Sequence, residues 1–223
     1  MRMPLCLRAM SDRELAPRQP ASERVLPADA TARGAALELA RLAGGGDARA
    51  TRRLLEQVAP RVAGAARAVM GRGHPELEDA VQLALIGFVQ ALPSFRGECD
   101  PAQFAARIAV RTAGATRRRA NARSGHQDPS VDLSAIEGST PEAGAAQRQA
   151  VLRRLLDDLA EEQAEALALR VVLGWSLDEI SAATGAPLNT VRSRLRLAKE
   201  ALRRRIADTP GLADELDPTE ART

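Results

Sequence analysis

Aromatic side chains are nearly absent from this sequence: 2% of its 223 residues are aromatic, with no Tyr, one Trp and three Phe. The hydrophobic fraction is still 45%, and it consists mostly of Ala, Leu and Val. Ala and Leu favour the helix, and few segments show the alternating β-branched or aromatic residues that are typical of strands. The composition therefore predicts an all-α fold with an aliphatic core.

Residues that bind metals or carry out catalysis are also scarce. Cys6 and Cys99 form no CxxC motif, and His74 and His126 lie far apart, outside any metal-ligand spacing. The glycines at 44–46 are not followed by the Lys-Ser/Thr of a phosphate-binding loop, and no Ser/His/Asp constellation is evident. We therefore expect no metal site, no cofactor and no enzyme activity.

Long apolar runs are missing as well. No stretch approaches the roughly 20 apolar residues that span a bilayer. The first ten residues, MRMPLCLRAM, have an apolar segment too short and too interrupted by charge for a secretion signal. These absences predict a cytoplasmic protein.

Charge is distributed unevenly, although the formal net charge is only +3. Residues 104–123 contain six Arg and no acidic residue, and residues 190–206 contain six Arg and one Lys against a single Glu. Basic clusters on predicted helices favour a polyanionic partner such as DNA, although a single cluster is as often a solvated surface.

Periodicity and turn residues predict two small helical domains on a tether. Asp47 is expected to cap a helix that ends before a turn at 71–75, and further helices are expected over 76–92 and 102–119. On the last of these, the arginines are expected to be exposed. The predicted divisions are a flexible tail (1–33), a first domain (34–120), a flexible linker rich in Ser, Gly, Asp and Pro (121–145), a second domain (146–206) and an acidic tail (207–223).

The sharpest local pattern is a helix-turn-helix between about 176 and 206. Ser176 and Glu179 form a capping box. Gly185 stands where a tight turn between helices needs a positive φ, and Pro187 suits the first turn of the next helix. The outward face of that helix is polar and basic: Asn189, Thr190, Arg192, Ser193, Arg194, Arg196 and Lys199.

Short polar residues at the start of a recognition helix reach base edges, and the basic residues beyond them contact phosphates. An ordinary helical hairpin with a charged surface is the alternative. The cap, the Gly turn and the Pro occur together with the basic face, and this combination favours DNA binding.

A family resemblance accompanies these motifs. The stretch LAEEQAEALALRVVLGWSLDEISAATGAPLNTVRSRLRLAKEALRR resembles the fourth, promoter-binding region of bacterial RNA polymerase sigma factors. Upstream, GDARATRRLLEQVAPRVAGAAR and ELEDAVQLALIGFVQALPSFRGE resemble their second region. With no third domain between them, the layout over about 36–206 resembles the extracytoplasmic function (ECF) subfamily.

The resemblance implies a sigma factor that binds core RNA polymerase and directs promoter-specific initiation. Glu78, Asp79 and Gln82 would dock on the polymerase β′ subunit, and the helix 187–199 would read the −35 element. Implied further partners are promoter DNA, the β subunit and, as in many members, an anti-sigma factor. The implied −10 contacts, from the loop 94–98 and the helix 103–119, are Phe95, Arg96, Phe104, Arg107, Arg111, Arg117 and Arg118.

Two departures from the family pattern concern the second region. Residues 104–107 read Phe-Ala-Ala-Arg where members often carry a Trp-Leu-Tyr-like run, so Phe95 and Phe104 are the remaining stacking platforms. Each stacked base contributes about 1–3 kcal/mol. The docking helix is also less charged than usual at 83–87. We therefore expect promoter melting that is weak, specialised or dependent on a helper.

Two other functions fit parts of the sequence. A conventional helix-turn-helix repressor or activator would need a dimerisation surface and a palindromic operator, and the sequence shows no zipper or ligand domain. A degenerate sigma-like decoy that binds a regulator would fit the aromatic-poor second region.

Overall fold

The computed structural model describes residues 27–123 and 155–209. The elements of these residues are α2 (Pro27–Gly44), α3 (Ala48–Met70), α4 (Leu77–Ala91), the 3-10 turn η1 (Leu92–Ser94), α5 (Pro101–Arg123), α7 (Glu161–Leu167), the π-helical turn η3 (Ala168–Val172), α8 (Leu177–Thr184) and α9 (Leu188–Asp208). All of them are helical, so the all-α prediction is confirmed.

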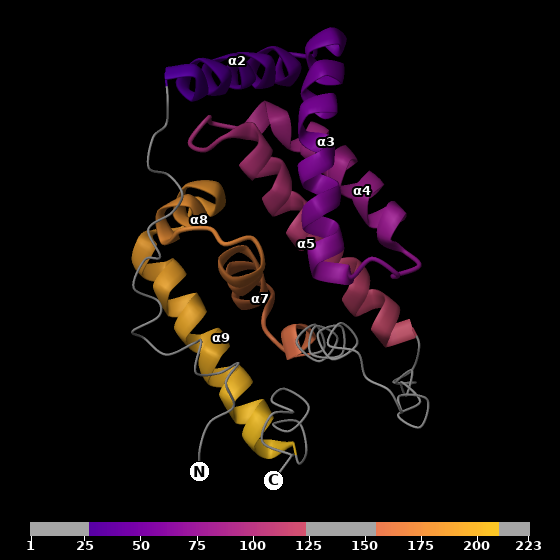
Figure 1. Ribbon diagram of the computed structural model, residues 1–223, viewed down its shortest axis with the longest axis vertical. Coiled ribbons are helices and arrows are strands. Elements are labelled where there is room, and N and C mark those ends of the chain that lie inside the picture. Colours follow the sequence, from indigo (N-terminus) through magenta and orange to yellow (C-terminus); the bar gives the residue numbers. More distant parts are fainter. Residues whose placement is uncertain (1–26, 124–154, 210–223) are drawn as a thin grey trace.

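The helices form two units, which Figure 1 shows in indigo to magenta and in orange to yellow. In the N-terminal unit (27–123), α3 and α4 both pack against α5, and α2 packs across α3. The C-terminal unit (155–209) consists of α7, η3, α8 and α9. Alanines line much of the N-terminal core and let the helix backbones approach closely. Its most deeply buried residues include Leu54, Val58, Val62, Ala80, Ala84, Phe88, Ala105, Ala106 and Ala109.

Local sequence signals explain where several helices begin and end. The Asp47 carboxylate accepts hydrogen bonds from the backbone N–H groups of Arg49 and Ala50, so it caps α3 as predicted. The predicted capping box of Ser176 and Glu179 is present at the start of α8, and Gly185 after it is left-handed with φ 66°. These features could be predicted from the sequence because each depends only on residues that are close in the chain.

Three helix ends differ from the predicted divisions. Helix α2 begins at Pro27, inside the predicted N-terminal tail; α5 continues to Arg123, and α9 continues to Asp208. Pro187 precedes α9 as its N-cap residue rather than lying in its first turn. The remainder of both predicted tails and most of the predicted linker fall outside the described residues. Among the helices of the described ranges, none is long and apolar enough to cross a bilayer.

Gly44 provides a test of how α2 is seated. A Cβ atom at this position would lie 3.0 Å from the backbone oxygen of Leu92 and 3.3 Å from its carbonyl carbon. Because backbone cannot rotate away as a side chain does, we expect Gly44→Ala to lower the free energy of unfolding by about 1 kcal/mol or more. Urea denaturation followed by circular dichroism measures the change.

Gly64 is the matched control, because it lies within α3 and a Cβ there would meet no atom within 4 Å. Gly64→Ala should raise stability by about 0.5–1 kcal/mol through helix propensity alone. Equal effects of the two substitutions would show that α2 does not lie against Leu92.

Candidate nucleic-acid interface

The helix-turn-helix consists of α8 and α9 joined at Gly185. Val191, Leu195 and Ala198 of α9 are buried, as are Ile180 and Ala183 of α8, so the two helices share one apolar core. The Ser181 hydroxyl donates to the Ala186 carbonyl at 2.7 Å, and the Thr184 hydroxyl donates to the Ile180 carbonyl at 2.6 Å. These bonds fix the turn and with it the direction of α9.

The structure exposes most of the predicted face of α9. Asn189, Arg192, Ser193 and Arg196 are exposed, and Thr190 and Arg194 are half-buried. The exception is Lys199, which was predicted on the outward face but is only 7% exposed. It lies one turn after the buried Leu195, which places much of its aliphatic stem over the apolar side of the helix.

A basic groove runs along this part of the C-terminal unit. Its volume is about 390 Å³, and its cationic side chains outnumber the single carboxylate, Glu200. Arg196 donates to Glu200 at 2.9 Å, and Arg192 donates to the side-chain oxygen of Asn189 at 3.1 Å. The positive residues that line the groove are Arg170, Arg192, Arg196, Lys199 and Arg203. A groove of this charge suits the phosphates of a nucleic acid.

The predicted base-binding loop lies between η1 and α5. The rings of Phe95 and Phe104 stack at 4.8 Å between centroids with 27° between their planes, so the two predicted platforms form one aromatic pair. Cys99 is buried beside them, and burial raises the pKa of its thiol to about 11, which keeps it protonated at neutral pH. The Asp100 carboxylate accepts from the Ala102 N–H at 2.7 Å and anchors the start of α5.

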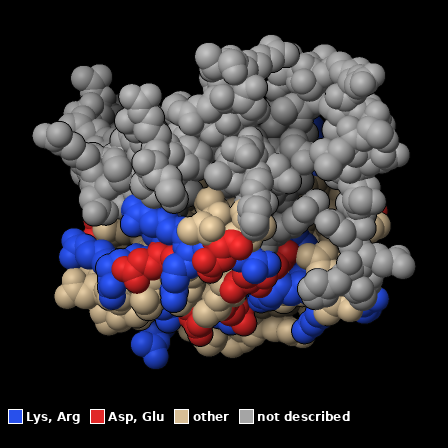
Figure 2. All heavy atoms as spheres, turned by 90° about the horizontal axis from the view of Figure 1, so that it is seen from below, with Lys and Arg blue, Asp and Glu red and all other residues tan. Residues whose placement is uncertain are grey.

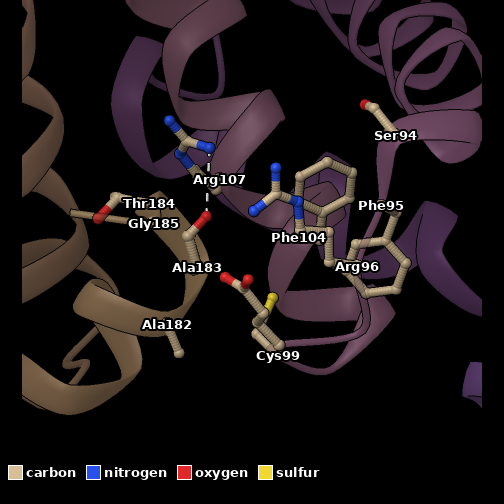
Figure 3. A pocket seen from close by; sticks show the side chains of 11 residues that line it. Ser94, Phe95, Arg96, Cys99, Phe104, Arg107, Ala182, Ala183, Thr184 and Gly185 are labelled. Atoms are coloured by element: carbon tan, nitrogen blue, oxygen red, sulfur yellow. Dashed lines mark hydrogen bonds between the residues drawn. The ribbon is translucent and has the colours of Figure 1, made fainter.

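A pocket of about 200 Å³ opens at this loop (Figure 3). The loop and α5 form one wall, with Phe95, Arg96 and Phe104 among its residues. The opposite wall is the end of α8, from Ala182 to Gly185. The site predicted for a −10 base is therefore covered in this structure by part of the helix-turn-helix.

The predicted −10 arginines on α5 are less exposed than expected. Arg117 is 5% exposed and Arg107 and Arg118 are half-buried, whereas Arg111 is exposed, as is Arg96 of the loop. The prediction that the α5 arginines face solvent is wrong for Arg117. The reason is tertiary, because α7 and α8 pack on the face of α5 that carries these residues.

The predicted polymerase-docking residues share an exposed face of α4. Glu78, Asp79 and Gln82 are all exposed. The same face carries Leu83 and Ile86, which are 49% and 46% exposed and which the sequence reasoning did not select. Both lie outside the buried side of α4, which is formed by Ala80, Ala84 and Phe88, and this position could have identified them from the sequence. Large apolar side chains held in water next to acidic ones are typical of a protein-binding surface.

Opposite charges are mixed on the surface as well. In the face seen from below in Figure 2, the described Lys and Arg side chains lie among Asp and Glu rather than in a patch of one sign. On this face, basic and acidic side chains of the described residues therefore lie next to one another.

Both units match models of known protein families. The chain matches the family model of sigma-70 region 2 over residues 54–123 and that of sigma-70 region 4 over residues 149–202. The two matches occur in the predicted order, on either side of the predicted linker. The presence of region 2 favours a sigma factor over a conventional helix-turn-helix regulator.

Curated relatives point to one subfamily. The chain is 33% identical over 141 residues to the ECF RNA polymerase sigma-E factor of Escherichia coli K12, which covers 57% of this chain and 72% of the relative. It is 28% identical over 175 residues to the sigma-E factor of Haemophilus influenzae, covering 72% of this chain and 89% of the relative.

Solved structures of similar chains include CnrH in complex with the cytosolic domain of CnrY, at 23% identity and a TM-score of 0.47, covering 78% of this chain and 99% of CnrH. Another is the sigma factor RpoE in complex with the anti-sigma factor NepR from Bartonella quintana, at 19% identity and a TM-score of 0.41, covering 70% of this chain and 96% of that one.

Regions 2 and 4 are thus both present, and the sequence identity to sigma-E factors extends over most of their length. The chain belongs to the ECF subfamily of RNA polymerase sigma factors, which direct the polymerase to initiate transcription at promoters.

Proposed function

We propose that α9 of this sigma factor reads the −35 element while the 94–98 loop and α5 contact the −10 element. The observation that carries the proposal is the polar face of α9, which stays exposed on a turn fixed by side-chain hydrogen bonds. Asn189 and Arg192 lie in its first turns, where a recognition helix meets base edges. The basic groove beside them supplies phosphate contacts.

The second half of the proposal concerns region 2. The stacked pair of Phe95 and Phe104 offers one aromatic surface on which an unpaired base can stack. Arg96 on the same loop is exposed and available to a neighbouring phosphate. Members of the family often carry several aromatic residues in this region, whereas this chain has one stacked pair. We therefore expect its promoter melting to be weak or assisted.

Helix α4 is the proposed docking surface for the β′ subunit. Its acidic residues provide charge, and Leu83 and Ile86 provide apolar area that association would remove from water. An anti-sigma factor is a further proposed partner, in keeping with the subfamily. The chain would act in the cytoplasm on promoter DNA and supply positioning, while the polymerase supplies all chemistry.

Reconstituted run-off transcription tests the proposed function. Purified chain is added to core polymerase and a promoter library, and the enriched promoters are footprinted. We expect core-dependent initiation with protection at two elements, one near −35 and one near −10. Core binding without initiation at any promoter would instead support the sigma-like decoy, and absence of core binding would refute the proposal.

Arg192 and Arg194 test the assignment of α9. If these side chains contact the −35 element, Arg192→Ala or Arg194→Ala should each weaken −35 binding by about 1–3 kcal/mol, or roughly 5- to 150-fold. Fluorescence anisotropy with a −35 duplex at fixed salt measures the loss. Arg53→Ala is the control, because Arg53 is an exposed arginine on α3, in the other unit. An equal loss of affinity in all three variants would show that the effect comes from net charge alone and not from contacts of α9 with the −35 element.

Leu83 tests the assignment of α4. A carboxylate at this position would be buried without a partner on docking, so Leu83→Glu should weaken core binding by about tenfold or more. The matched control is Leu42→Glu, since Leu42 is also a leucine on a helix of the N-terminal unit and is 37% exposed. Pull-down and native gel titration with core enzyme report the affinity. Unchanged core binding by Leu83→Glu would exclude this face of α4.

A further inference from the structure

The basic groove along α9 combines positive charge with an apolar strip. Two leucines, Leu177 of α8 and Leu195 of α9, line it together with the five cationic side chains and Glu200. Its volume of about 390 Å³ lies within the range of ligand-binding clefts in proteins. A groove of this composition suits a ligand that carries several carboxylates or phosphates together with apolar groups.

Most cations of the groove are not neutralised by a carboxylate of the described residues. Arg170 donates to the Trp175 carbonyl at 2.7 Å, and Arg192 donates to the amide oxygen of Asn189, so both have uncharged acceptors. Within the described ranges, Arg203 has neither a hydrogen-bonding nor an ion-pairing partner. The groove therefore keeps a positive charge that an anionic ligand would neutralise.

The segment that follows α9, residues 210–223, has the opposite charge. It contains four acidic residues against one Arg: Asp214, Glu215, Asp217 and Glu220. Leu212 and Leu216 lie among these acids, four residues apart. The sequence of the segment thus matches the groove twice, because it offers carboxylates to the arginines and leucines to the strip of Leu177 and Leu195.

The segment is long enough to reach the groove. Helix α9 ends at Asp208, and Thr209 after it is extended, with φ −111° and ψ 105°. Pro210 and Gly211 come next, a pair that favours a turn and can direct the chain back along α9.

The distances along α9 are short compared with this reach. Arg192 lies 17 residues before Thr209 in sequence, about 25 Å along a helix axis. Glu220 lies 11 residues after Thr209 and can extend up to about 36 Å. The acids of the segment can therefore meet arginines over the whole length of the groove.

We propose that residues 210–223 bind in the basic groove of their own chain, as an acidic peptide that competes with nucleic acid for α9. The competition rests on the proposed function of α9. Carboxylate and phosphate oxygens both accept charge-assisted hydrogen bonds from guanidinium, so each arginine serves one of them at a time. A tethered segment has an effective concentration on the order of millimolar, which lets individually weak ion pairs hold it.

Carbodiimide cross-linking tests whether the segment lies in the groove. Lys199 is the one Lys of the sequence and is only 7% exposed. Arg203→Lys therefore supplies an exposed amine at the groove and keeps the charge. The matched control is Arg204→Lys, the next residue of α9, which is equally classed as exposed but does not line the groove.

Mass spectrometry of the cross-linked monomer identifies the carboxylates that react. We expect Arg203→Lys to cross-link to Asp214, Glu215 or Asp217 several times more than Arg204→Lys does. Reaction with Glu200, three residues away on the same helix, is the internal positive control. Equal cross-linking to the segment from both positions, or none, would overturn the proposal. Cross-linked dimers in place of monomers would overturn it as well, by showing that a second copy occupies the groove.

DNA binding without polymerase tests the competition. The variant combines Asp214→Asn, Glu215→Gln and Asp217→Asn, which change no residue of a described helix. Its charge-matched control combines Glu38→Gln, Glu56→Gln and Glu162→Gln, at exposed positions on α2, α3 and α7.

The probe is a fluorescein-labelled pool of random double-stranded DNA, followed by fluorescence anisotropy at fixed salt. We expect the variant of the segment to bind about tenfold tighter than the parent chain, because a groove that is free only a tenth of the time weakens apparent affinity by that fraction. Equal tightening in the charge-matched control would overturn the proposal.

The two readouts separate this inference from the proposed function. Preferential cross-linking without a gain in DNA binding would overturn the competition, while run-off transcription with protection at both elements would leave the proposed function standing. Preferential cross-linking and tighter binding, in a chain that fails in run-off transcription, would uphold this inference and refute the proposed function alone.

Discussion

The arginines along α5 impose the constraint on which the rest of the structure depends. A guanidinium cannot lie in an apolar core without an acceptor, so a helix that buries Arg117 must be met by anions and carbonyl oxygens. Asp157 and the Val69 carbonyl meet that need for Arg117, and Glu165 meets it for Arg107. The two carboxylates belong to the C-terminal unit and hold it against α5. Ion pairs therefore contribute to the packing of the two units. The same charges make α5 suitable for a nucleic acid backbone, and this shared chemistry links the fold to the proposed contact of α5 with the −10 element.

The C-terminal unit has two sides of opposite charge. Its acidic side, on α7 and at Asp157, faces α5, while its basic side, along α9 and the groove, faces solvent. Under the proposed function, α9 engages the −35 element and α5 the −10 element while core polymerase holds the N-terminal unit by α4. Two modest DNA contacts on one tether then strengthen each other through effective concentration.

The sequence predicted those parts of the site that depend on neighbouring residues. The Asp47 cap, the capping box at Ser176 and the left-handed Gly185 each follow from a few adjacent side chains, and all are present. Lys199 was misplaced although its spacing from Leu195 indicated the buried side. The burial of Arg117 could not be predicted, because the partner that covers it is 40 residues away in sequence, beyond the predicted linker. Leu83 and Ile86 were missed because a search for charged docking residues passes over apolar ones.

The central claim is that α5 contacts the −10 element, which requires that Glu165, held by α5 in the free chain, is released on promoter DNA. Carbodiimide labelling of carboxylates, read by mass spectrometry, measures this directly. Glu162 lies on the same helix and is exposed, so it serves as the internal reference. We expect slow labelling of Glu165 relative to Glu162 in the free chain, and comparable labelling of the two in the complex with core polymerase and promoter. Glu165 that remains protected in that complex would contradict it.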